Sequence, residues 1–157
     1  PMSDTSIYTR TVLCDLDGTI ADCSERLNYV KIKPKNWKAF YAGIENDKPI
    51  QSVIDSVIGL WHTGYQVVYC TGRPEDFRET TVVWFNKYLP SFLTTAPLYM
   101  RRTKDNRPDY IVKEELLSEI RADGYNPTLA FEDRGRVVDM YRRNGIFVLN
   151  TNQGEDY

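Results

Sequence analysis

The sequence predicts an α/β fold: a Rossmann-like parallel sheet with helices on both faces. Strand-like and helix-like segments alternate along the chain, which is typical of repeated strand–helix units. The clearest strand-like runs, TVLC, QVVYC, TLAF and IFVL, are continuously apolar. Parallel strands are buried on both sides and have this pattern. A length of 157 residues suits one compact domain, so we expect residues 1–157 to form a single domain.

Five strands are expected from short apolar runs that carry turn or polar residues at their ends. The first spans Thr11–Leu16. The second spans Gln66–Cys70 and is closed by the sequence TGRP. A weaker third strand is expected at residues 97–100. The last two span Thr128–Phe131 and Ile146–Leu149.

Four helices are expected between these strands. Residues 50–61 carry apolar side chains at helical spacing, and Gly64 marks the stop. Asp109 is placed to cap the N-terminus of a later helix. Residues 22–48 mix lysines with aromatic residues and predict no firm element. The expected helices span residues 50–61, 74–88, 110–122 and 136–143.

Polar residues lie at the C-terminal ends of three of the expected strands. In parallel sheets ligands bind beyond the carboxyl ends of the strands, so these residues are expected to converge on one edge. The residues are Asp15 and Asp17 after the first strand, Thr71 and Arg73 after the second, and Glu132 and Asp133 after the fourth.

Four carboxylates at one edge repel each other unless a cation or a proton intervenes. Hard oxygen ligands suit Mg²⁺, which commonly binds one or two carboxylates together with a substrate phosphate. Thr71, Arg73 and Lys113 supply donors and positive charge for such a phosphate. An aspartate can act as a nucleophile that forms an aspartyl-phosphate. A second carboxylate two residues on can transfer protons if its neighbours raise its pKa.

These residues carry a family resemblance. Asp15-Leu-Asp17-Gly-Thr19 resembles the first motif of the haloacid dehalogenase superfamily of phosphohydrolases. Thr71-Gly72-Arg73 is similar to the second motif, Lys113 to the third, and Glu132-Asp133 to the fourth. The resemblance implies the fold of that superfamily. Neither residues 28–41 nor the basic residues before Asp109 form a stretch long enough for a large lid. We therefore expect a small cap or none and a rather open site.

A closer resemblance lies in the second half of the chain. The sequences RPDYIVKEE (107–115), EDR (132–134) and VVDMYRRNG (137–145) resemble the 3′-phosphatase domain of the phage polynucleotide kinase–phosphatase family. This resemblance implies removal of 3′-phosphates from DNA or RNA ends or from nucleotides. The phosphate-binding loop G-x-x-x-x-G-K-[ST] of a kinase is absent from the sequence.

Roles follow from the residues and the resemblance together. Asp15 is expected to be the nucleophile and a metal ligand. Asp17 is expected to be the general acid and base, and the resemblance implies that its backbone carbonyl binds the metal. Thr71 and Lys113 are expected to hold the phosphoryl group. Asp133 is expected to bind magnesium, with Glu132 as a second ligand or as a residue that orients metal-bound water. The expected substrate-binding residues are Arg26, Gly72, Arg73 and Asp109.

Two stretches are candidates for substrate selection. Residues 28–41 interleave lysines with aromatic residues, and a basic run precedes Asp109. Cations bind backbone phosphates and aromatic rings stack on unpaired bases. The alternative is a solvated loop whose aromatic rings join the core. If the basic run binds substrate, charge reversal at Arg101 and Arg102 weakens polynucleotide substrates more than a small phosphate ester. The run consists of Arg101, Arg102, Lys104 and Arg107.

Other functions stay open at this point. The length and charge of the chain do not separate a 3′-phosphatase from a 5′-nucleotidase or another small phosphomonoesterase of the same superfamily, and a non-catalytic nucleic-acid-binding domain is a third alternative. The net charge of −2 gives no global attraction to nucleic acid. The three cysteines have no metal-type spacing and favour a reducing cytoplasm. No apolar run approaches the roughly 20 residues of a membrane span.

Overall fold

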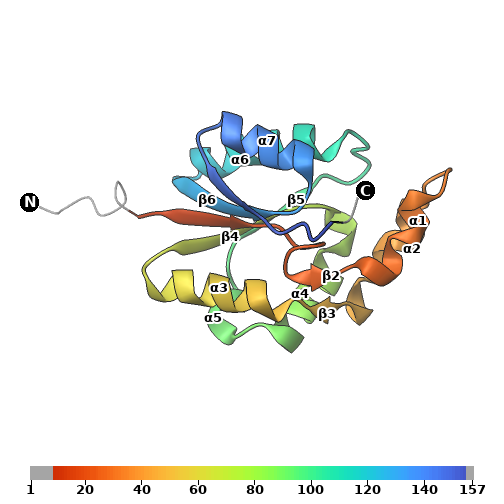
Figure 1. The fold of residues 1–157 in the computed structure, drawn as a ribbon, viewed down its shortest axis with the longest axis horizontal. Coiled ribbons are helices and arrows are strands. Elements are labelled where there is room, and N and C mark those ends of the chain that lie inside the picture. Colours follow the sequence, from red (N-terminus) through yellow and green to blue (C-terminus); the bar gives the residue numbers. More distant parts are fainter. Residues whose placement is uncertain (1–8, 155–157) are drawn as a thin grey trace, which may run out of the picture.

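The computed structural model describes residues 9–154 and confirms the parallel sheet (Figure 1). The strands lie in the order β5-β4-β1-β6-β7, and every neighbouring pair is parallel. The first strand of the chain is therefore central, as a buried TVLC run predicts. The strands are β1 (Thr11–Cys14), β4 (Gln66–Pro74), β5 (Leu98–Arg101), β6 (Pro127–Glu132) and β7 (Phe147–Asn150).

Helices cover both faces of this sheet (Figure 1). Val12 and Cys14 of β1 join one apolar cluster, whereas Leu13 between them joins the other, which is why the run is apolar throughout. Each fully buried side chain of this kind contributes roughly 1.5–3 kcal/mol. One face carries α3 (Gln51–His62), α4 (Arg78–Tyr88) and α5 (Ser91–Thr94), and the other carries α6 (Asp109–Ala122) and α7 (Gly135–Arg143).

The structure corrects several expected boundaries. Strand β4 continues through the TGRP sequence to Pro74, because β5 still pairs with it beyond an irregularity after Thr71. A short 3₁₀ turn, Glu75–Phe77, precedes α4, and α5 was not predicted. The prediction that Asp109 caps α6 was wrong. Pro108 holds the cap position, and the Asp109 carboxylate accepts hydrogen bonds from two arginines instead.

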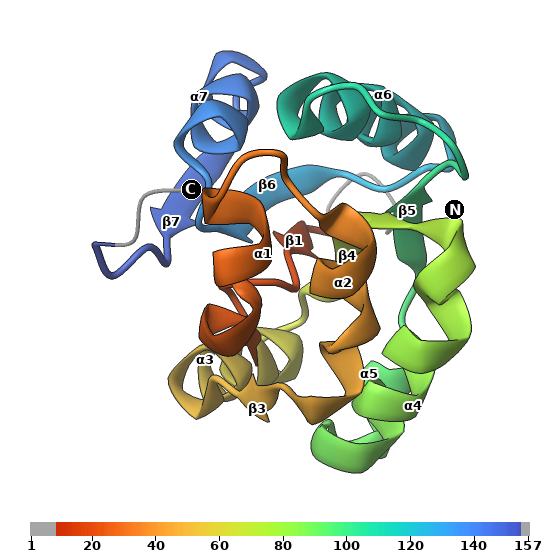
Figure 2. The same cartoon turned by 90° about the vertical axis from the view of Figure 1, so that its right-hand side faces the viewer.

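Residues 24–46, which we call the insert, form small elements beyond the carboxyl ends of the strands (Figure 2). The insert contains α1 (Asn28–Lys31) and α2 (Trp37–Ala42) and has its own small apolar cluster. Its helices are too short for a periodic apolar pattern, which explains why the sequence predicted no firm element there. The strands β2 (Ala21–Asp22) and β3 (Lys48–Pro49) pair antiparallel at its base.

Two further features concern membrane-spanning helices and the cysteines. Within residues 9–154, no helix combines the length and the apolar character that crossing a membrane requires. Cys14, Cys23 and Cys70 are all free thiols in buried positions. Burial raises the pKa of each of these three thiols, so they pack as neutral side chains.

Candidate active site

Asp15 lies directly after β1, at the carboxyl edge of the sheet, and is buried. Its Oδ1 accepts a hydrogen bond from Lys113 Nζ at 2.8 Å, and its Oδ2 accepts one from Thr19 Oγ1 at 3.1 Å. The turn after Leu16 brings Thr19 back to Asp15, and Gly18 adopts a positive φ of 78° within that turn. The Asp15 carboxylate is thus held in one orientation by two donors from different parts of the chain.

Lys113 reaches this edge from α6, and only 1% of its surface is exposed. Besides Asp15, its ammonium donates to Glu132 Oε2 at 2.7 Å. Burial alone lowers the pKa of a lysine, but the carboxylates of Asp15 and Glu132 outweigh it and hold the pKa of Lys113 well above its usual value. Lys113 therefore remains a cation, which is the state that the phosphate-holding role requires.

Three buried carboxylates lie together at the ends of β1 and β6. Asp15, Glu132 and Asp133 each place one oxygen within 4.8 Å of the others. A set of hard oxygen ligands of this kind fits Mg²⁺. Glu132 is already engaged, since its Oε1 accepts from the backbone N–H groups of Asp133 at 3.1 Å and Arg134 at 3.2 Å. Glu132 therefore fits the alternative role of orienting its neighbours, and metal binding by Asp15 and Asp133 stays a prediction.

Asp17 faces away from this cluster, toward two arginines. Its carboxylate accepts from Arg73 Nη2 and Arg26 Nη2, both at 2.7 Å, and from Arg73 Nε at 3.1 Å. Burial raises the pKa of a carboxyl group, but here Arg73 and Arg26 outweigh it and hold the pKa of Asp17 well below its usual range. The condition for proton transfer, a pKa of Asp17 raised by its neighbours, is not met in this structure, because the nearest groups are guanidinium ions rather than carboxylates.

Arg26 is itself fixed by a residue that the sequence did not indicate. Its Nε and Nη2 donate to the two carboxylate oxygens of Asp47 at 2.8 and 2.6 Å, and its Nη1 donates to the carbonyl of Phe40 at 2.6 Å. Both members of the pair are buried. Asp47 thus determines the position of Arg26 and, through it, of Asp17. That Arg26 and Arg73 bind substrate stays a prediction.

Replacing Asp47 by asparagine is expected to lower the free energy of unfolding by roughly 1–3 kcal/mol, because one donor of buried Arg26 loses its acceptor. Activity should fall as well, since Asp17 loses an anchored partner. Urea unfolding and turnover of the same preparation measure both effects. Asp55→Asn, on the exposed surface of α3, is the matched control and should stay within about 0.5 kcal/mol of the unmodified chain. If both variants had the same free energy of unfolding and the same turnover, Asp47 would not be what positions Arg26 and Asp17.

Gly72 and Asp109 pack too closely to admit any side chain on Gly72. A Cβ atom there would lie 2.6 Å from Asp109 Oδ1 and 2.9 Å from its Cγ. Asp109 cannot easily move away, because Arg101 donates to Oδ1 and Arg134 donates to Oδ2. Burial raises the pKa of Asp109, but the charges of Arg134, Lys113 and Arg101 outweigh burial and bring the pKa below its usual value. The Asp109 carboxylate is therefore ionised.

Substituting Gly72 by alanine should therefore lower the free energy of unfolding by about 1–3 kcal/mol through overpacking. It should also displace Asp109 and reduce activity. Gly59→Ala is the control, since a Cβ at Gly59 in α3 meets no atom within 4 Å. That change should be neutral or stabilise the helix by up to about 1 kcal/mol. Thermal unfolding of the two variants gives the comparison, and an unchanged midpoint for Gly72→Ala would contradict the packing argument.

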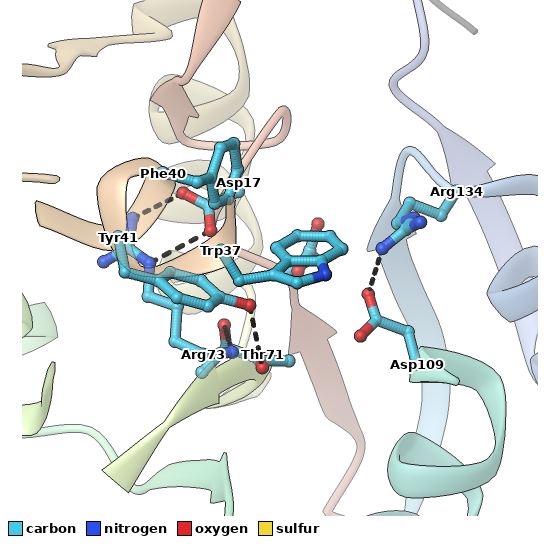
Figure 3. A pocket seen from close by; sticks show the side chains of 10 residues that line it. Asp17, Trp37, Phe40, Tyr41, Thr71, Arg73, Asp109 and Arg134 are labelled. Carbon is cyan, nitrogen blue, oxygen red and sulfur yellow. Dashed lines mark hydrogen bonds and ion pairs between the residues drawn. The ribbon is translucent and has the colours of Figure 1, made fainter. Parts of the chain in front are cut away.

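A pocket opens between the insert and α6 (Figure 3), and Asp15 is among the residues that line it. Trp37, Phe40 and Tyr41 of α2, which we call the aromatic cluster, form one side, and Asp109 and Arg134 form the other. The Tyr41 hydroxyl donates to the Gly72 carbonyl at 3.4 Å, which ties the aromatic cluster to β4. The remaining residues around the pocket are Asp15, Asp17, Thr71, Gly72 and Arg73.

The three arginines of the basic run before α6 are engaged in ion pairs. Arg101 is only 8% exposed, and its guanidinium donates to the Gly72 carbonyl at 2.7 Å and to Asp109. Arg102 pairs with Glu119, and Arg107 pairs with Asp105 and Glu115. Reversing the charge of Arg101 would break its contacts with Gly72 and Asp109, so this substitution does not separate substrate binding from local structure. Substrate binding by the basic run stays a prediction.

The structure brings the predicted residues to one edge of the sheet. Arg134 and Thr19 were missed as site residues, although both lie inside or beside the motifs. Trp37 was noted only as one of several aromatic residues, and Asp47 gave no signal. The predicted site residues around the pocket or in contact with Asp15 or Asp17 are Asp15, Asp17, Arg26, Thr71, Gly72, Arg73, Asp109 and Lys113. Glu132 contacts Lys113 and lies with Asp133 in the carboxylate cluster.

Comparisons with known proteins agree with this geometry. Residues 9–156 match the model of the polynucleotide kinase PNKP phosphatase domain family. The chain is 30% identical over 137 residues to the "Putative bifunctional polynucleotide kinase/RNA ligase" of Autographa californica nuclear polyhedrosis virus. That match covers 86% of this chain but 18% of the viral protein.

Solved structures show the same relationship. A chain of the Pnkp1/Rnl/Hen1 complex is 30% identical, with a TM-score of 0.77 over 94% of this chain and 47% of that one. The class C acid phosphatase of Bacillus anthracis shares the fold at 15% identity, with a TM-score of 0.67 over 93% of this chain and 67% of that one. The chain thus spans less than half the length of the first relatives it matches.

Proposed function

The chain belongs to the polynucleotide kinase PNKP phosphatase domain family, and from this premise we propose that it removes 3′-phosphates from polynucleotide ends or nucleotides with the help of Mg²⁺. The substrate is then a phosphorylated nucleic-acid end or a 3′-nucleotide. The longer relatives are named for kinase and ligase activities and for a complex, and we do not extend these to this chain.

The observation that carries this proposal is the fixed position of Asp15 at the floor of the pocket. Lys113 and Thr19 orient its two oxygens, and the aromatic cluster, Arg134 and Asp109 surround the space above. A carboxylate held by an ammonium and a hydroxyl suits attack on an electron-poor phosphorus. A positioned nucleophile with cationic support is the main requirement of phosphoryl transfer.

The proposed reaction has two displacements. In the first, an Asp15 carboxylate oxygen bonds to phosphorus while the bond from phosphorus to the 3′ oxygen breaks, and that oxygen takes a proton from Asp17. In the second, a water oxygen bonds to phosphorus, Asp17 takes its proton, and the bond between phosphorus and the Asp15 oxygen breaks. Phosphate leaves and Asp15 returns to its starting state. Lys113 and Thr71 hold the phosphoryl oxygens in both steps.

Asp17 has to release its arginine contacts and take up a proton from solvent water before the first step. Arg26 and Arg73 hold Asp17 ionised here, and an ionised Asp17 is able to accept the proton of water in the second step. We infer that substrate binding redirects one of these guanidinium groups to phosphate, which would free Asp17 and agrees with the expected substrate-binding role of the two arginines.

Asp15, Asp133 and the backbone carbonyl of Asp17 would hold the magnesium ion, with Glu132 orienting its surroundings. When bound, the ion supplies positive charge that offsets the repulsion between the carboxylates and the phosphate. The donor chemistry of the three clustered carboxylates supports this assignment.

Phosphate release from matched oligonucleotides tests the proposed function. The substrates end in a 3′-phosphate or a 5′-phosphate and are accompanied by 3′- and 5′-mononucleotides, each with Mg²⁺ and with chelator. Metal-dependent release confined to 3′-phosphates is the expected result. Release mainly from 5′-mononucleotides would retain the Asp15 chemistry and replace the substrate assignment with the nucleotidase alternative.

A further inference from the structure

The insert carries the features of a single-stranded nucleic-acid site, and this inference rests on the proposed function. Between Glu25 and Glu45 the sequence contains no acidic residue, although the whole chain has a net charge of −2. Lys33, Lys35 and Lys38 lie within this stretch and are exposed. The arginines of the basic run before α6 behave differently, since each of them is paired with a carboxylate.

Trp37 lies among these lysines and also borders the pocket. Trp37 is 37% exposed, and its indole stands between Asp17 on one side of the pocket and Asp109 and Arg134 on the other (Figure 3). Lys35 places its Nζ 5.5 Å from the centre of the Trp37 ring system, so charge and aromatic surface are contiguous. A ring in this position can meet the nucleotide whose phosphate lies at Asp15.

The aromatic cluster holds Trp37 in place before any ligand arrives. Trp37 stacks on Tyr41, with ring centroids 5.9 Å apart and an interplanar angle of 23°, and meets the edge of Phe40 at 5.5 Å. Phe40 lies beneath the Arg26 guanidinium at 4.3 Å, and the Tyr41 hydroxyl donates to Gly72. A preorganised ring loses little conformational freedom when a base stacks on it.

We propose that Trp37 stacks on the base of the 3′-terminal nucleotide, and that Lys33, Lys35 and Lys38 bind the backbone phosphates of the preceding nucleotides. Stacking of bases on aromatic rings tolerates any base, and lysines read only backbone charge. The insert therefore selects single-stranded polynucleotide ends over small phosphate esters, with little preference for sequence.

The test of the stacking role compares two oligonucleotides with 3′-phosphates, one ending in an ordinary nucleotide and one ending in an abasic sugar. For Trp37→Ala, KM and the binding constant should worsen roughly tenfold more for the base-bearing substrate than for the abasic one. Trp37→Phe should restore most of that difference. If Trp37→Ala weakens both substrates equally, or Trp37→Phe restores nothing, the stacking role is overturned.

The test of the lysines uses the variant K33E/K35E/K38E and the salt dependence of binding to a single-stranded oligonucleotide. Loss of three phosphate contacts should reduce the slope of log K against log salt by about 2. The control K87E/R142E/R143E makes the same charge change at exposed positions on the ends of α4 and α7. An unchanged slope in the first variant, or the same change in both, would overturn the lysine role.

These outcomes separate the inference from the proposed function. Binding is measured beside turnover, so the role of the insert is tested even in a chain that releases no phosphate. Absence of phosphate release by the unmodified chain, with binding that still depends on Trp37, would overturn the phosphatase assignment and leave the nucleic-acid site standing. Release from 3′-phosphates with the same KM for the abasic and the base-bearing substrate would do the reverse.

Discussion

Lys113→Met is expected to lower the free energy of unfolding by about 3–5 kcal/mol, which is a large part of the stability of a domain this size. The substitution keeps most of the side-chain volume but removes the one ammonium between the buried carboxylates of Asp15 and Glu132. Two carboxylates then face each other without a cation. Urea-induced unfolding, performed with chelator so that no metal replaces the lysine, measures the loss.

A second substitution identifies the cause of that loss. K113M/E132Q should be more stable than K113M, because glutamine removes one of the two negative charges and still accepts from the backbone N–H groups of Asp133 and Arg134. Lys87→Met, on the exposed surface of α4, should change stability by no more than about 0.5 kcal/mol. If K113M and K113M/E132Q unfold alike, charge repulsion is not the cause.

Asp15→Asn is expected to reduce turnover by about four to six orders of magnitude, the size of effect seen when a covalent nucleophile is removed. Asparagine keeps the shape and still accepts from Lys113 or Thr19, so the fold should persist. Steady-state phosphate release and circular dichroism of the same sample separate the two effects. Asp139→Asn, exposed on α7, is the control and should retain full activity. Activity of Asp15→Asn within tenfold of the unmodified chain would exclude Asp15 as the nucleophile.

The sheet and its active edge were predictable because they depend on local signals. Continuous apolar runs identified the parallel strands, and the order of polar residues at their ends placed Asp15, Thr71 and Glu132 together. Such patterns reflect burial on both faces of a sheet, which leaves little freedom to the sequence. Helix α5 has only four residues, too few for a period to show.

Contacts between distant segments were not predictable in the same way. Asp47 bonds Arg26 across 21 positions in the sequence, and neither residue type nor spacing indicates that pair. The low pKa of Asp17 follows from where two guanidinium groups point, which depends on the packing of the insert against β4. The insert itself is held by a small apolar cluster of its own and by aromatic contacts, none of which has a fixed period.

Arg101 shows how composition alone misleads. A run of four basic residues within seven positions suggested a surface for phosphates, yet the first of them is buried and holds Gly72 and Asp109 in place. The insert is also rich in basic residues, but its lysines lie exposed beside Trp37, which borders the pocket. Among residues 9–154, pairing with a carboxylate is a property of the fold, and it distinguishes the three arginines from Lys33, Lys35 and Lys38.

The most direct test of the account is whether phosphate becomes covalently attached to Asp15. The chain is mixed with Mg²⁺ and an oligonucleotide carrying a radiolabelled 3′-phosphate, quenched in acid within milliseconds to seconds, and digested for peptide mapping. The account predicts label on the peptide that contains Asp15, released by hydroxylamine and absent from Asp15→Asn. Rapid phosphate release with no labelled protein at any time, together with activity in Asp15→Asn, would contradict it.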